Sequence, residues 1–332
     1  LVCYRLFDFL QKNSTAICLL LLMLCSIFKL LLSSDQYVNM IYSPHDDGLY
    51  VMRAFSILNY GDFGEYDSRL LVKNLGFSLY LSLIRLIGIP YLLSLNFLLI
   101  IAVVCLFNNL KKISLDPYLA LLICITLLLT PVAFDHQWIR VLREPLSTIL
   151  FIFLFSSIIS LFACLERGRI TIWSIVSLSF FSTLLYITRE EDVIVLTFPI
   201  LIIAIRYFFF ESSNKISFLK IFFPFVLIFY SYIALTQLSL SLFVKNNYGN
   251  SVVNDFGSGE FPKLIASIRS IKTEKNNRHV SIPQESLNKL RLEVPEFIPV
   301  LDRMPPPSIT SYSCERFKVC SEWTNGWHYF WL

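Results

Sequence analysis

The sequence predicts an all-α polytopic membrane protein. Of its 332 residues, 55% are hydrophobic and only 16% are charged, and the mean hydropathy is +0.63. Soluble domains carry about 25% charged residues. The apolar residues gather in runs close to the length of about 20 residues that a helix needs to cross a bilayer. We therefore expect about seven or eight transmembrane helices in residues 1–244. The more polar, proline-rich residues 245–332 predict a small soluble, mainly helical segment or a loop.

The first residues predict a cytoplasmic N-terminus and one span. Arg5 and Lys12 place residues 1–14 on the cytoplasmic side by the positive-inside tendency. The first apolar run predicts a span at 15–33. Lys29 falls near the outer end of this span, where a long side chain can reach back to water.

An outer loop should follow at residues 34–74. Within it, residues 46–60 have the pattern of an amphipathic helix that lies along the membrane surface. Pro44 suits the start of such a helix and Gly61 suits its end. We expect one side of this helix to carry Leu49, Met52, Arg53, Ser56 and Tyr60. Interfacial apolar bulk would come from Tyr50, Phe55 and Leu58.

The apolar stretch 75–110 is interrupted at Gly88-Ile89-Pro90, so it predicts either two short spans or one span plus a re-entrant piece. The two readings differ in the side on which Lys111 and Lys112 lie. Charge favours the cytoplasm for these lysines, whereas strict alternation through two spans puts them outside. Further spans are predicted at 117–133, 146–165, 170–187, 193–210 and 216–243.

The net charge of +4 and the scattered basic residues do not favour a nucleic-acid partner. Most of the cysteines lie in apolar runs, and only Cys314 and Cys320 are placed to form a disulfide or to stay as two free thiols. The chain ends within an aromatic run, Trp327 to Trp331, and we expect the polar segment to continue beyond it.

Three clusters of ionisable residues stand at predicted span ends, and the first is His45-Asp46-Asp47. A carboxylate beside a like charge at a membrane surface has a raised pKa and can act as a general base toward a hydroxyl group. Alternatively, Asp46 and Asp47 with His45 hold a divalent cation such as Mg²⁺ or Mn²⁺, which is the one cofactor that the sequence suggests. The pair also fits a third role, as acidic residues that stabilise the start of the surface helix.

The second cluster is Arg140, Arg143 and Glu144. In a continuous helix, the i, i+3, i+4 spacing puts these side chains on one face. Two guanidinium groups at a membrane boundary form a clamp for a phosphate or diphosphate, with Glu144 orienting one of them. Membrane anchoring or an internal ion pair is the alternative.

The third cluster is Arg189-Glu190-Glu191-Asp192, between two apolar runs. Acidic residues contribute little to membrane topology, so we expect these groups to line a cavity or form ion pairs.

Several motifs of the chain resemble a known family. An apolar span, a surface loop that begins with paired acids, and many further spans are similar to the GT-C fold of lipid-dependent glycosyltransferases. This fold includes protein mannosyltransferases, oligosaccharyltransferases and aminoarabinose transferases. A closer resemblance is to a group of bacterial membrane proteins of no established activity. It rests on residues 45–50, 61–67, 71–73, 88–90, 140–145, 188–191 and 253–261.

The resemblance implies an enzyme of the bacterial inner membrane that takes a sugar from a lipid-linked donor. Asp46 or Asp47 would be the base or the metal-binding acid. The substrate-binding group would comprise His45, Lys73, Arg140, Arg143, Glu144, Arg189 and Glu190. The chain departs from the closer group after Lys73, where Asn74-Leu75-Gly76 replaces Gly-Pro-Gly, which implies a different donor or a relaxed loop.

The rival interpretation is a transporter or flippase of a lipid-linked or anionic solute, in which the charged clusters form a pathway. Transporters usually contain two related halves, and the sequence shows no internal symmetry, which favours the enzyme.

Overall fold

The computed structural model describes residues 13–39, 46–66, 70–166, 171–189, 197, 201, 215–255, 257–272 and 284–303. Over these residues the chain is helical and contains no strand, as the sequence predicts. The predicted span 193–210, except residues 197 and 201, and the pair Cys314 and Cys320 lie outside the described residues. The chain forms two compact units. The first comprises Leu1–Gly64 and Asn74–Asn247, and the second comprises Glu65–Lys73 and Tyr248–Leu332.

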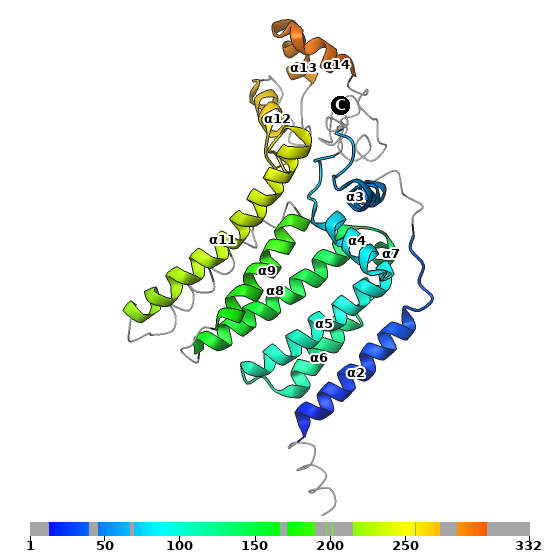
Figure 1. Ribbon diagram of the computed structural model, residues 1–332, viewed down its shortest axis with the longest axis vertical. Coiled ribbons are helices and arrows are strands. Elements are labelled where there is room, and N and C mark those ends of the chain that lie inside the picture. The colour runs from blue at the N-terminus through cyan, green and yellow to red at the C-terminus, as the bar shows by residue number, and fades with distance from the viewer. Residues whose placement is uncertain are drawn as a thin grey trace, which may run out of the picture. The chain divides into compact units, whose positions relative to one another are not determined.

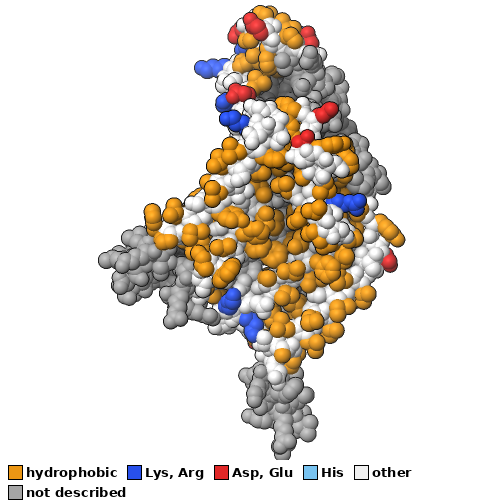
Figure 2. Space-filling view, in the orientation of Figure 1, with side chains coloured by type: hydrophobic (Ala, Val, Ile, Leu, Met, Phe, Trp, Pro, Cys, Tyr) orange, Lys and Arg blue, Asp and Glu red, His pale blue; other side chains and the backbone are white. Residues whose placement is uncertain are grey.

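The first unit contains the helices that are suited to a membrane (Figure 1). Its elements are α2 (Ser14–Leu32), α3 (Asp46–Tyr60), α4 (Gly76–Ile87), α5 (Tyr91–Lys112), α6 (Pro117–Leu128), η1 (Pro131–Phe134), α7 (His136–Ile139), α8 (Arg143–Glu166), α9 (Ile172–Thr188) and α11 (Lys215–Tyr248). Within the described part of the chain, five helices are long and apolar enough to span a bilayer, namely α2, α5, α6 with η1, α8 and α11. Figure 2 shows a largely hydrophobic surface over these helices.

The stretch 75–110 divides at a turn. Gly88 ends α4 with a φ of +81°, a left-handed conformation that suits glycine. Pro90 then precedes α5 and cannot continue the earlier helix. The 12 residues of α4 span about 18 Å, which is too short for a bilayer, whereas the 22 residues of α5 are long enough. Of the two predicted arrangements, two short spans are therefore not observed, because α5 is long enough for a full span and only α4 is short.

The bundle has two ends, which its side-chain contacts identify. At the first, here called the lysine end, Lys111 Nζ bonds to Thr15 Oγ1 and Lys112 Nζ lies 3.4 Å from Ser160 Oγ. Lys111 and Lys112 therefore lie at the same end as the start of α2. Since Arg5 and Lys12 precede α2 in the sequence, the arrangement agrees with the charge-based expectation for the lysines.

The opposite end, here called the arginine end, is where α2 finishes and where α5 and α8 begin. Lys29 on α2 contacts Ala133, and Tyr91 at the start of α5 contacts Arg140. Helix α9 also ends at the arginine end. The first residue of α4, Gly76, packs there against Ile187 near the end of α9. A Cβ atom at Gly76 would lie 2.7 Å from the Ile187 carbonyl oxygen, so glycine permits this close approach. Asn74 Nδ2 donates to the Tyr186 carbonyl oxygen at 2.8 Å in the same region.

Lys29 does not reach back to water, so that prediction is wrong. Its side chain is 0% exposed. Nζ donates to the Ala133 carbonyl oxygen at 2.8 Å and lies 3.4 Å from the centroid of the Phe134 ring. A carbonyl group and an aromatic face replace the water that this group would otherwise bind.

The second unit contains α12 (Glu260–Ser270), α13 (Gln284–Glu293), η3 (Pro295–Phe297) and α14 (Ile298–Arg303). The segment 70–73 is buried in it, and the Asp255 amide donates to the Leu71 carbonyl oxygen at 2.8 Å. Burial also raises the pKa of the Asp255 carboxyl group. Two stretches that are far apart in the sequence are thus joined through their backbones.

Candidate functional site

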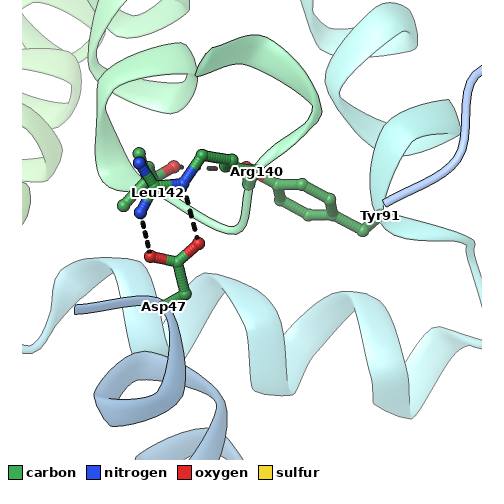
Figure 3. Close-up of polar contacts among 4 residues, drawn as sticks. All are labelled: Asp47, Tyr91, Arg140 and Leu142. Carbon is green, nitrogen blue, oxygen red and sulfur yellow. Dashed lines mark hydrogen bonds and ion pairs between the residues drawn. The ribbon is translucent and has the colours of Figure 1, made fainter. Parts of the chain in front are cut away.

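The centre of the candidate site is an ion pair between Asp47 and Arg140. Arg140 Nε donates to Asp47 Oδ2 at 3.1 Å and Arg140 Nη2 donates to Oδ1 at 2.7 Å (Figure 3). The Asp47 side chain is 0% exposed and that of Arg140 is 16% exposed. A two-point pair of this kind fixes both the distance and the plane of the guanidinium group.

The backbone around Arg140 is held as well as its side chain. The Tyr91 hydroxyl group donates to the Arg140 carbonyl oxygen at 3.0 Å and lies 3.4 Å from that of Leu142 (Figure 3). On the other side, Asn39 forms a parallel bridge with Arg140, and its amide donates to the Ile139 carbonyl oxygen at 3.0 Å. Helices α3 and α5, together with Asn39 in the segment that follows α2, therefore all contribute to the position of one arginine.

Arg140, Arg143 and Glu144 do not share one helix face, so this prediction is wrong. Arg140 has extended backbone angles, and α8 begins only at Arg143. Pro145 explains the break, because proline is tolerated in the first turn of a helix but not in its interior. Arg143 is buried, and its Nε lies 3.8 Å from Glu144 Oε1. Two arginines still lie at the arginine end, but on separate elements.

Helix α3 has the predicted bounds but a different orientation. Its buried face carries Asp47, Tyr50, Arg53 and Ala54, whereas Val51, Met52, Phe55 and Leu58 are exposed. Met52 and Arg53, expected on one side, are 67% and 1% exposed respectively. The helix thus presents its charged groups to the protein and apolar groups outward, an arrangement that suits the hydrocarbon boundary of a membrane.

Arg53 and Lys29 are buried charged groups that the sequence interpretation did not include in the site. Arg53 stands three residues after Tyr50 and six after Asp47, a spacing that puts all three on one helix face. That spacing was available in the sequence. Lys29 gave no comparable signal, since its partner Ala133 is 104 residues away.

The other predicted site residues are placed only in part. Asp46 is half-buried in the first turn of α3, next to Asp47. Arg189 follows α9 at the arginine end. Lys73 is buried, but it belongs to the second unit. His45, Glu190, Glu191 and Asp192 lie outside the described residues.

Metal binding by the acidic pair can be considered from its contacts. In the described part of the chain, no three His, Cys, Asp or Glu side chains are grouped to hold a metal ion. Both carboxylate oxygens of Asp47 accept hydrogen bonds from Arg140. In this arrangement Asp46 is the better placed of the two to meet a cation or a substrate.

Comparisons with known protein families, with curated proteins and with solved structures find no match to this chain.

Proposed function

We propose that this chain is a membrane glycosyltransferase of the bacterial inner membrane that moves a sugar from a polyprenyl-phosphate donor to a hydroxyl group. The observation that carries the proposal is the buried ion pair of Arg140 with Asp47, which lies in the first turn of α3, a helix that is apolar on its outer side. A lipid-linked donor needs both features. Its tail requires an apolar surface, and its phosphate requires a preorganised cation near that surface.

Asp46 and Asp47 have different roles in the proposed reaction. Asp46, the more accessible acid, takes the proton of the acceptor hydroxyl as the new glycosidic bond forms. The bond between the sugar and the donor phosphate breaks, and its electron pair leaves with the polyprenyl phosphate. Asp47 fixes the Arg140 guanidinium, and Arg140 with Arg143 stabilises the charge on the departing phosphate.

Lys73, Arg189, His45, Glu144 and Glu190 remain proposed substrate contacts from the resemblance. A divalent cation bound through Asp46 is the alternative to direct proton transfer. Adding a chelator distinguishes these two mechanisms, because it abolishes transfer only if the cation takes part.

The test uses the full chain in nanodiscs with radiolabelled polyprenyl-phosphate hexoses and pentoses, and alkyl glycosides as acceptors. Asp46→Asn should lower the rate of transfer by about 10²–10⁴-fold, because the base is lost. Asp47→Asn should lower the rate of transfer and also the thermal stability, because it weakens the ion pair with Arg140. The matched control is Glu260→Gln, which removes an exposed acid of the second unit.

If Asp46→Asn transfers sugar at the wild-type rate, the proposed mechanism is wrong. A chain that transfers no sugar, but moves these lipids across sealed proteoliposomes, is instead a flippase.

A further inference from the structure

Lys29 is a buried lysine on a helix that otherwise suits a lipid-facing position. Its neighbours Ile27, Phe28 and Leu31 are exposed, as lipid-facing residues are in a bundle without its bilayer. Ionisable side chains in transmembrane helices are costly and usually have a specific partner. Lys29 has two partners, and both belong to η1: the Ala133 carbonyl oxygen and the Phe134 ring.

The element that Lys29 contacts leads directly to Arg140. The connection 131–142 comprises η1, Asp135, α7 and the extended residues before α8. Lys29 donates a hydrogen bond to Ala133 near the beginning of this connection, and the Asn39 amide donates to the Ile139 carbonyl oxygen nearer its end. Tyr91 then bonds to the Arg140 carbonyl oxygen. Helix α2 and the residues after it therefore contact this connection at two points, one before α7 and one at the last residue of α7.

We infer that Lys29 is a positioning residue for Arg140. By fixing Ala133 and Phe134, it sets where the connection leaves the bundle, and so where the Arg140 guanidinium meets Asp47. This inference does not rest on the proposed glycosyltransferase activity, because it concerns the geometry of the ion pair alone.

A lysine is not needed here for packing. A methionine fills a similar volume and tolerates irregular surroundings. A cationic donor can bond to a carbonyl oxygen and also interact with the face of an aromatic ring, whereas the methionine side chain has no N–H or O–H to donate. Replacement by methionine therefore removes the positioning contact while it keeps the apolar contacts of the side chain.

The test is amide hydrogen exchange of the full chain in nanodiscs, followed by mass spectrometry. Lys29→Met should speed exchange in the peptide 131–142 about fivefold, as expected for the loss of one hydrogen bond. Peptides from α5 and α8 should exchange as in the wild-type protein. Lys29→Arg should restore protection, because a guanidinium group can donate to the carbonyl oxygen and lie over the ring.

Lys111→Met is the matched control. It removes another lysine contact to α2, with Thr15, but at the lysine end, so the peptide 131–142 should be unaffected. The link to the ion pair is tested in the Lys29→Met background. There, Asp47→Ala should speed exchange in this peptide less than it does in the wild-type background, because the pair is already misplaced.

The inference would be overturned if the peptide 131–142 of Lys29→Met exchanged at the wild-type rate. It would also be overturned if the exchange rate rose equally in all helices. If Lys29→Met does not insert, Phe134→Leu is used instead. It keeps the hydrogen bond but removes the ring, and it should speed exchange in the same peptide; no change there would also overturn the inference.

Discussion

Asp47 and Arg140 are separated by 93 residues of sequence, yet they form a two-point ion pair with an Nη2–Oδ1 distance of 2.7 Å. Asp47 is in the first turn of α3, and Arg140 lies in the extended residues before α8. The pair joins the surface helix to the bundle.

Removal of one partner of this pair should be costly. We expect Asp47→Ala to lower the free energy of unfolding by about 3–5 kcal/mol, because it leaves the charge of Arg140 largely buried without its carboxylate. Asp47→Ala combined with Arg140→Met should cost less than the sum of the single changes. Equilibrium unfolding in mixed micelles gives these values. Additive effects would show that the two residues stabilise the chain independently.

The close approach of α4 and α9 should not tolerate a side chain at residue 76. Gly76→Ala places a Cβ atom 2.7 Å from a backbone oxygen, which cannot rotate away. We expect a loss of about 1–3 kcal/mol in the free energy of unfolding, as in other overpacked interiors. Gly257→Ala is the control, since a Cβ atom there meets nothing within 4 Å. Equal stability of the two variants would contradict the observed packing.

The exposed face of α3 should contact lipid. A fluorophore attached at Met52→Cys, in a background without native cysteines, should show blue-shifted emission in nanodiscs and be quenched by spin-labelled lipids. The same fluorophore at His136→Cys, an exposed residue of α7, should be quenched less. Equal quenching at the two positions would mean that α3 does not lie in the membrane boundary.

Asp255 should make the second unit less stable as the pH rises. Burial raises the pKa of its carboxyl group above the ordinary value of 3.8. The folded chain therefore holds the proton more tightly than the unfolded chain, and this contribution is lost as the pH rises through the raised pKa.

Asp255→Asn should therefore slow amide exchange around residues 250–260 at neutral pH, after correction for intrinsic exchange rates. It should have no effect below about pH 3, where the acid is protonated in both states. If Asp255→Asn slowed amide exchange equally at every pH, the charge of the Asp255 carboxylate would not be the cause.

The sequence predicted local features well where a single segment determines them. Helix α3 begins and ends as expected, because the stop at Gly61 and the apolar pattern are local signals. The break at Gly88 and Pro90 was also visible, although the sequence left the lengths of the flanking spans open.

Features that depend on distant partners could not be predicted in this way. The spacing of Arg140, Arg143 and Glu144 suggested one helix, but the pair with Asp47 and the position of Pro145 determine the backbone there. The position of Lys29 near a helix end is equally compatible with solvent contact and with an internal partner. Only the packing of α2 near η1 distinguishes these two cases.

The contact between Lys111 and Thr15 has a practical consequence for any assay in sealed vesicles. Helix α2 begins at the lysine end and finishes at the arginine end, so Thr15 and the Asp47–Arg140 pair lie at opposite ends of the bundle. An impermeable reagent that reaches Thr15 therefore reports the orientation in which the Asp47–Arg140 site faces the vesicle lumen. In a test of the proposed transfer reaction, acceptors supplied from outside reach this site only in the molecules inserted the other way round.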